Sequence, residues 1–185
     1  GAFENCSSLK TIDLPTSITS IGASAFRNCT DLTSVTIRNG VTKIGNMAFE
    51  NCTSLEEIRL PSSITSIGIQ AFYNCANLTE VTILDGVTDI GEAAFRNCIS
   101  LLEATIPDSV ISIGEKAFEN SYQLESVTIQ GTNLLEIKNE AFQNCNRLKT
   151  FSISENSSLT LIGNYAFSNT NLFEFVVGKA VNSIG

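Results

Sequence analysis

A short phrase of the sequence recurs at a fixed interval and limits the fold more than any other feature. AFRNC occupies residues 25–29, and close copies stand at 48–52, 71–75 and 94–98. Phenylalanines from Phe3 to Phe118 are spaced 23 residues apart, Phe142 follows after 24 residues and Phe167 after 25. The repeated unit reads A-F-x-N-C-x-x-L-x-x-I-x-I-P-x-x-V-x-x-I-G-x-x. Its copies follow one another without a linker, so residues 1–185 form one repeat domain.

The unit contains a strand signal that makes sense only in a stack. L-x-x-I-x-I alternates apolar and polar residues, which is the period of a half-buried strand. One such strand cannot bury its apolar face alone, but stacked copies form a parallel sheet with strands about 4.8 Å apart. Proline ends the strand because it cannot donate to the ladder. The V-x-x-I stretch crosses back and is compatible with a second short strand.

The remaining segments of the unit predict how each coil closes. The glycine after V-x-x-I is expected to adopt a backbone angle closed to other residues, so Lys138, which replaces it once, predicts a locally different turn. The segment G-x-x-A-F-x-N predicts one or two helical turns with Ala and Phe packed inward. A period of 20–29 residues around L-x-x-I-x-I is typical of leucine-rich repeats. We therefore expect an α/β, right-handed leucine-rich-repeat solenoid of about eight coils, with a parallel sheet on the concave face and short helical turns on the convex face.

The residue pattern of the unit also resembles that of one repeat family. The signatures I-G-x-x-A-F-x-x-C and L-x-x-I-x-I-P in a 23-residue unit resemble the BspA-like leucine-rich repeats, and they recur along the whole chain. Later units depart from the pattern: Ser121 and Thr170 replace cysteine, and extra residues enter near 131–133 and 155–158. The resemblance implies a surface-attached or secreted protein of mucosal bacteria or protozoan parasites that adheres to host matrix or cells. It carries over no binding residue, because the motif is structural.

Six cysteines invite a chemical role, but packing explains them best. Cysteines of adjacent coils point in parallel, so their Cβ atoms stay about 5 Å apart, more than the ~3.8 Å of a disulfide. Zinc is disfavoured because the chain has no histidine and no C-x-x-C pair. Catalysis is disfavoured because a cysteine nucleophile needs a neighbouring general base, and a row of equivalent cysteines has none. Free cysteine behaves as a small buried hydrophobe, and Ser121 and Thr170 are similar in volume.

An asparagine follows the phenylalanine by two positions in every unit, from Asn5 to Asn169. We expect these amides to be buried and to satisfy backbone groups in the turn and in the neighbouring coil.

Composition excludes several classes of function. The net charge is −8 and the pI about 4.5, whereas nucleic-acid binding needs clustered Lys and Arg. No apolar run approaches the length of a membrane span, so no membrane insertion is expected in this segment. Without histidine, a phosphate-cradling loop or a recognisable acid pair, we expect no enzyme, no cofactor and no metal site.

Binding is expected on the polar positions of the strand, which a solenoid presents as an extended surface. One column holds glutamates in three successive units, and the other is rich in threonine. The candidate binding face comprises Glu57, Arg59, Glu80, Thr82, Glu103, Thr105, Ser126 and Thr128. Like charges aligned across strands are mildly destabilising, so a basic protein patch or Ca²⁺ would relieve the row. A solvated face with Arg59 and counter-ions nearby is the simpler alternative.

The chain shows no cap at either end. Phe173 and Val176 are expected to face outward on the last strand, where a further coil or another molecule would cover them. We therefore expect a fragment of a longer protein, with end-to-end self-association as an alternative. The function we predict is a non-enzymatic module that binds a protein or glycan at the cell surface or after secretion. Alternatives are a cytoplasmic protein–protein scaffold, consistent with free thiols, and a spacer that carries another domain.

Overall fold

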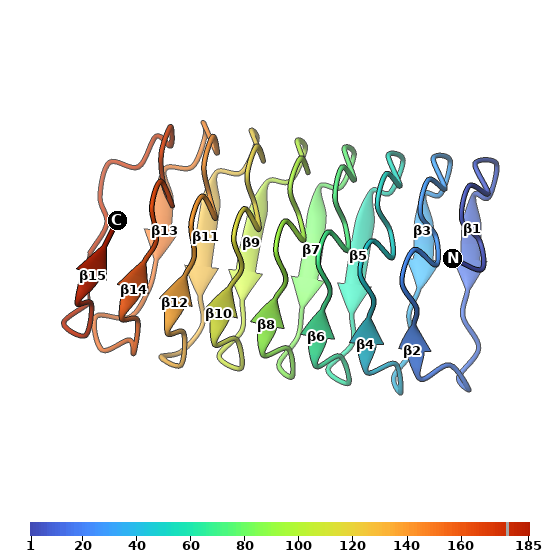
Figure 1. Cartoon of the computed structure of the whole chain (residues 1–185), viewed down its shortest axis with the longest axis horizontal. Helices are drawn as coiled ribbons and strands as arrows, with labels where there is room; N and C mark the ends of the chain where they lie inside the picture. The colour runs from blue at the N-terminus through green and yellow to red at the C-terminus, as the bar shows by residue number, and fades with distance from the viewer. Residues whose placement is uncertain (177) are drawn as a thin grey trace.

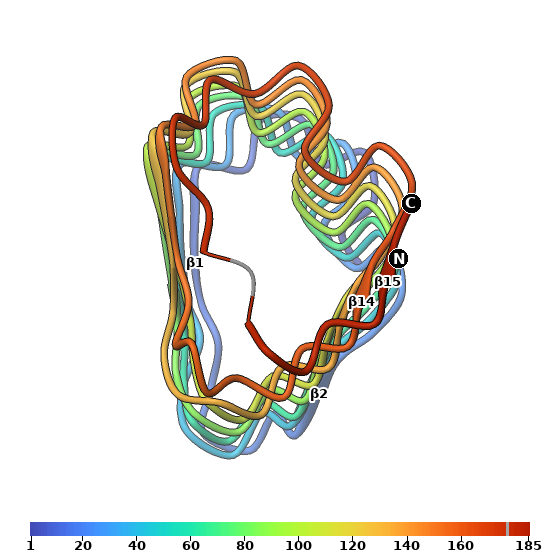
Figure 2. The same ribbon diagram turned by 90° about the vertical axis from the view of Figure 1, so that its left-hand side faces the viewer.

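The computed structural model describes residues 1–176 and 178–185 as a row of stacked coils. Figure 1 shows the coils side by side in an almost straight row, with the two chain ends in the first and last coils. Viewed along the row in Figure 2, the coils superpose as one closed outline. The predicted solenoid of about eight coils is confirmed, although the row shows little of the expected concave curvature.

Each of the first seven coils contributes a longer strand on one side, and every coil contributes a two-residue strand on the other. The longer strands are β1 (Thr11–Asp13), β3 (Ser34–Thr36), β5 (Glu57–Leu60), β7 (Glu80–Ile83), β9 (Glu103–Ile106), β11 (Ser126–Ile129) and β13 (Thr150–Ser152). The short strands are β2 (Ser20–Ile21), β4 (Lys43–Ile44), β6 (Ser66–Ile67), β8 (Asp89–Ile90), β10 (Ser112–Ile113), β12 (Glu136–Ile137), β14 (Leu161–Ile162) and β15 (Ser183–Ile184).

All strand pairing is parallel and joins equivalent positions of neighbouring coils. The longer strands form a pair β1-β3 and a five-stranded sheet in the order β13-β11-β9-β7-β5, which together make the long-strand face. The short strands form one eight-stranded sheet, β15-β14-β12-β10-β8-β6-β4-β2, so the predicted second strand is confirmed. Pro61 and Pro107 directly follow β5 and β9, as expected of a residue that cannot donate to the ladder.

The predicted helical turns are wrong: no helix occurs among residues 1–176 and 178–185. The segment that contains A-F-x-N is instead a run of tight turns. The Phe26 N–H donates to the Ala48 carbonyl of the next coil (2.8 Å), whereas the Arg27 N–H donates back to Ser24 (3.1 Å). Residues in the left-handed region, such as Ser24 (φ 55°) and Asn28 (φ 59°), interrupt any helical path. Inter-coil hydrogen bonds therefore replace intrahelical ones.

The repeated glycine has a different role from the one predicted. Among the described glycines, only Gly40, Gly86 and Gly131 have positive φ, and none of them belongs to the I-G column. A Cβ on Gly68 would lie 2.6 Å from the Gly45 carbonyl carbon, so close approach of adjacent coils requires glycine here. The prediction of a different turn at Lys138 is also wrong, because its backbone makes the same hydrogen bond as the glycines. Its N–H donates to Ile113 (3.0 Å), as glycines donate in the other coils.

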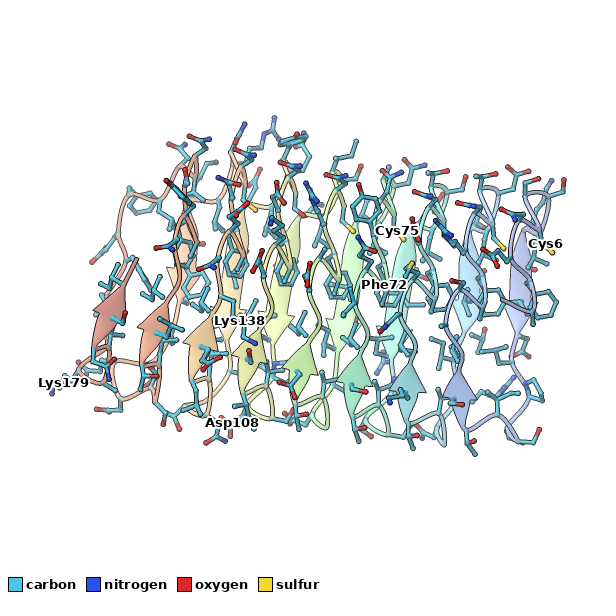
Figure 3. All side chains as sticks on the ribbon, in the orientation of Figure 1. Cys6, Phe72, Cys75, Asp108, Lys138 and Lys179 are labelled. Carbon is cyan, nitrogen blue, oxygen red and sulfur yellow. The ribbon has the colours of Figure 1, made fainter. Side chains whose placement is uncertain are left out.

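The core is a set of continuous side-chain columns, as the repeat predicts. The Phe rings stack along the whole row, and adjacent rings such as Phe49 and Phe72 lie 5.2 Å apart and almost parallel. Phe72 and Cys75, labelled in Figure 3, are both fully buried. Leucine and isoleucine columns from the strands fill the space below the rings. Val177, which the repeat places at the second isoleucine position of L-x-x-I-x-I in the last unit, lies outside the described residues.

Candidate binding face

The structure places all eight predicted binding residues on the long-strand face. In the sheet, Glu57 is paired with Glu80, and Glu80 with Glu103. Glu103 is paired with Ser126 and Thr105 with Thr128, which continue the two columns into the next coil. The polar positions point outward because strand side chains alternate, and Ile and Val between them point into the core.

The glutamate row, Glu57–Glu80–Glu103, faces solvent. None of its carboxylates forms an ion pair with the described residues, nor does Arg59. The Thr82 hydroxyl donates to Oε1 of Glu80 (3.3 Å) and helps to orient it. Two open hollows cover the row; Glu80 and Thr82 line both of them. Arg59 lines the hollow that Glu57 and Glu80 share, but it forms no ion pair with either of them, and like charges opposite one another are mildly destabilising.

No metal site is evident on this face. Among residues 1–176 and 178–185, no group of three or more Cys, Asp or Glu side chains is arranged to hold a metal ion. The row is a straight line of carboxylates and lacks the converging oxygen ligands that Ca²⁺ takes.

The cysteines form a packed column of free thiols. Cys29, Cys52, Cys75, Cys98 and Cys145 are buried, and only Cys6, in the first coil, is exposed. Each buried Sγ donates to the backbone carbonyl of a phenylalanine in the preceding coil, for example Cys75 to Phe49 (3.2 Å). Ser121 makes the same bond with its hydroxyl, to Phe95 (3.3 Å). The predicted packing role is confirmed, with a hydrogen bond that the sequence did not reveal.

Burial also suppresses the chemistry of these thiols. It raises the pKa of Cys52, Cys98 and Cys145 to about 12, although the hydrogen bond from the backbone of the preceding coil partly opposes this shift. Burial raises the pKa of Cys75 as well, and the neighbouring Cys98 and Cys52 add to the effect. Because the thiolate is the reactive form, buried thiols in apolar surroundings are inert near neutral pH.

The asparagine column differs from its prediction. The amides are half-buried in the inner coils, and their side chains bond to one another instead of to the backbone. Asn51 donates to Oδ1 of Asn28 (2.8 Å) and accepts from Nδ2 of Asn74 (2.9 Å). Asn97 is an exception, since it donates to the Tyr73 hydroxyl (3.2 Å). Every residue of this column has a φ between 57° and 63°, a region that asparagine tolerates better than most side chains.

Sequence reasoning overlooked a charged column beside the phenylalanines. Arg27 pairs with Glu50, and Arg96 pairs with Glu119, each with Nε and Oε2 2.8 Å apart. The Arg96 guanidinium also lies over the Tyr73 ring, 5.9 Å from its centroid. Glu50 and Glu119 are buried. The sequence does contain a signal for these ion pairs: acidic and basic residues alternate from unit to unit at the position between Phe and Asn. This alternation predicts ion pairs only once adjacent units are known to be in contact.

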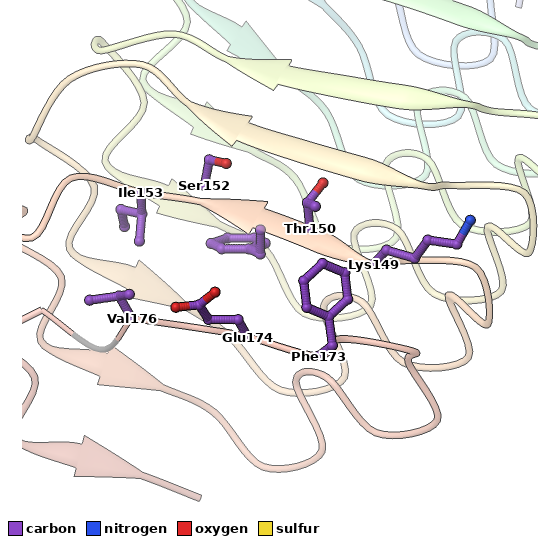
Figure 4. Close-up of a pocket in the computed structure, with 8 residues that line it drawn as sticks. Lys149, Thr150, Ser152, Ile153, Phe173, Glu174 and Val176 are labelled. Atoms are coloured by element: carbon purple, nitrogen blue, oxygen red, sulfur yellow. The ribbon is translucent and has the colours of Figure 1, made fainter.

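The last coil leaves a hollow at the end of the long-strand face, lined by both apolar and polar side chains (Figure 4). Phe173 is 76% exposed and Val176 is also exposed, so the predicted outward direction of both is confirmed. Among residues 1–176 and 178–185, only an isolated bridge, Thr150 to Glu174, continues the sheet into this coil. The further coil and the end-to-end association expected from the sequence stay predictions.

Comparisons with known proteins agree with this architecture. The family model described as "BspA type Leucine rich repeat region" matches six copies over residues 1–101 and 65–185. No curated protein matches the chain. No helix among residues 1–176 and 178–185 is long and apolar enough to cross a membrane.

Solved structures give the same result. A leucine-rich repeat protein from Bacteroides ovatus is 32% identical over 100% of this chain, with a TM-score of 0.89. One from Eubacterium ventriosum is 27% identical over 90% of the chain (TM-score 0.82), and one from T. pallidum is 29% identical over 77% (TM-score 0.74). The chain spans 47%, 44% and 68% of these three proteins, respectively. The chain belongs to the BspA-type leucine-rich repeat family.

Proposed function

We propose that the chain is a non-enzymatic binding module that engages a protein partner through the long-strand face. The observation that carries this proposal is the glutamate row, which the sheet fixes at regular spacing and whose carboxylates form no ion pair with the described residues. The inner columns are occupied by packing contacts, so the outward positions are the part of each coil that is free to recognise a ligand. A glycan is the second candidate ligand, because Thr82, Thr105 and Thr128 add a row of hydroxyls beside the carboxylates.

Adhesion at the cell surface or after secretion is the setting that the family resemblance favours. BspA-type repeats are typical of surface-attached and secreted proteins, and a rigid polar face suits contact with matrix or another cell. A cytoplasmic scaffold is the alternative, and free thiols are consistent with it. A signal peptide with an anchor in the full-length protein would favour adhesion, whereas a catalytic neighbour would favour the scaffold or spacer role.

Reversing the charge of the glutamate row tests the proposed function. The triple variant Glu57→Lys, Glu80→Lys, Glu103→Lys is expected to keep the fold, because all three side chains are exposed. Its binding to a panel of matrix proteins and glycans, measured by surface plasmon resonance, is expected to fall at least ten-fold, since attraction becomes repulsion.

The matched control for this experiment carries the same change in charge elsewhere. Asp89→Lys, Glu92→Lys, Glu155→Lys alters three exposed acids outside the long-strand face. It is expected to leave binding within two-fold of wild type. Equal losses in the two variants, or no loss in the first, would show that the long-strand face does not bind the ligand.

A further inference from the structure

The structure exposes an apolar rim beside the glutamate row. Ile99, Leu102 and Tyr122 are 40%, 49% and 43% exposed, respectively. They interrupt columns that are otherwise polar or small. The equivalents of Ile99 and Tyr122 in units one to four and seven are Ser7, Thr30, Thr53, Ala76 and Asn146. The equivalents of Leu102 in units one to four are Lys10, Thr33, Glu56 and Thr79. An apolar cluster where the pattern allows polar residues marks a candidate contact surface.

The rim adjoins the end of the glutamate row. Leu102 directly precedes β9, and Glu103 is the first residue of that strand. The Leu102 N–H donates to Thr79 (3.3 Å), and its carbonyl accepts from Glu125 (2.8 Å), which fixes it in the same stacking register as the row. The glutamate row occupies units three to five, Ile99 and Leu102 belong to the same coil as its last acid, and Tyr122 lies one coil further along the solenoid axis.

The spacing of the row selects the kind of partner that lies along this axis. Adjacent coils are about 4.8 Å apart, so the three carboxylates span about 9.6 Å. An α-helix presents one side chain per turn of about 5.4 Å, and three such side chains span about 10.8 Å. An extended strand presents one side chain per face every ~6.7 Å, and three of them span about 13.4 Å. Flexible lysine and arginine side chains can compensate for the small difference in span between the helix and the glutamate row more easily than for the larger difference between the strand and the row.

We propose that the partner is a basic amphipathic helix that lies along the solenoid axis, across β5, β7 and β9. Lys or Arg side chains on three successive turns meet Glu57, Glu80 and Glu103. Apolar side chains at one end of the helix cover Ile99, Leu102 and Tyr122. Charge complementarity selects this occupant, because the candidate binding face carries three carboxylates against one cation, Arg59, and an apolar rim adjoins it. The inference rests on the proposed function and specifies its ligand.

Three synthetic peptides of identical composition test this partner class by fluorescence anisotropy with the intact chain. The first places Lys at positions i, i+4 and i+7, with leucines beside this stripe at one end. The second distributes the same residues around the helix, and the third alternates Lys with polar residues as a strand would. The first peptide is expected to bind at least ten-fold more tightly than the others, and its binding is expected to weaken as salt is raised from 50 to 300 mM.

Protein variants locate the contact. Each exposed ion pair changes an equilibrium constant by up to about five-fold, so Glu57→Gln, Glu80→Gln, Glu103→Gln is expected to weaken binding of the first peptide at least ten-fold. Leu102→Thr, which installs the residue of the preceding unit, is expected to weaken it about three-fold. The control Asp89→Asn, Glu92→Gln, Glu155→Gln is expected to leave it within two-fold.

The outcomes separate this inference from the proposed function. Equal binding of the first two peptides, or tighter binding of the strand-like peptide, would overturn the helical partner. If no peptide binds while charge reversal still abolishes binding to the protein and glycan panel, the helical partner is wrong and the proposed function stands. If neither measurement responds to changes on this face, both are wrong.

Discussion

Replacement of Phe72 by alanine is expected to lower the free energy of unfolding by about 3–5 kcal/mol, the range for loss of a fully buried aromatic ring. Phe72 is fully buried and stacks between two other rings. The ring centroids lie 5.2 Å from Phe49 and 5.2 Å from Phe95, with the planes nearly parallel. Alanine would leave a cavity in the middle of the row and remove both ring contacts. Urea denaturation followed by circular dichroism measures the change.

The same substitution at the first coil is the matched control. Phe3 is 39% exposed and stacks on one ring only, Phe26. Phe3→Ala is therefore expected to cost about 1–2 kcal/mol, because much of the ring is already in water. Equal losses at Phe3 and Phe72 would contradict the role assigned to neighbouring coils in stability.

Replacement of Asn51 by leucine is expected to cost about 2–4 kcal/mol, for two separable reasons. The substitution leaves Oδ1 of Asn28 and Nδ2 of Asn74 without their hydrogen-bond partner. It also forces leucine into the left-handed region, since φ at position 51 is 60°. Thermal and urea denaturation of the variant measure the combined effect.

Asn51→Gly separates the two causes. Glycine accepts the positive φ without strain but still removes the side-chain ladder, so the loss is expected to be about 1–2 kcal/mol. A loss equal to that of leucine would mean that the backbone angle has no part in selecting asparagine. Wild-type stability in both variants would mean that the ladder contributes nothing.

The repeat predicted the stacking and the inward columns because both follow from sequence spacing. Phe49, Leu55 and Ile58 recur in register, and a strand period decides which of their neighbours face out. The helical turn was predicted wrongly because Ala48 and Phe49 point inward in a helix and in a run of tight turns alike. The glycine column was misread for a related reason. The close approach at Gly68 depends on the distance between coils, which a single unit does not encode.

The candidate site shows the same limit. Alternation along the strand correctly placed Glu80 and Thr82 on the exposed face, and adjacency of units gave the glutamate row. The apolar rim and the Arg96–Glu119 pair were missed because they appear only as departures from the repeat. Leu102 in a column of Lys, Thr and Glu was visible in the sequence, but its importance depends on lying beside Glu103 in space. Binding by the face stays a prediction.

Counting the thiols that react with Ellman's reagent most directly tests whether the recurring residues build a continuous dry interior. In native buffer at pH 8, one of the six cysteines, the exposed Cys6, is expected to react rapidly. The other five are buried, and burial raises the pKa of Cys52, Cys98 and Cys145 to about 12, so they are expected to react only after guanidinium is added. Rapid reaction of four or more thiols in the native chain, or fewer than six after unfolding, would contradict the stack of free, buried thiols.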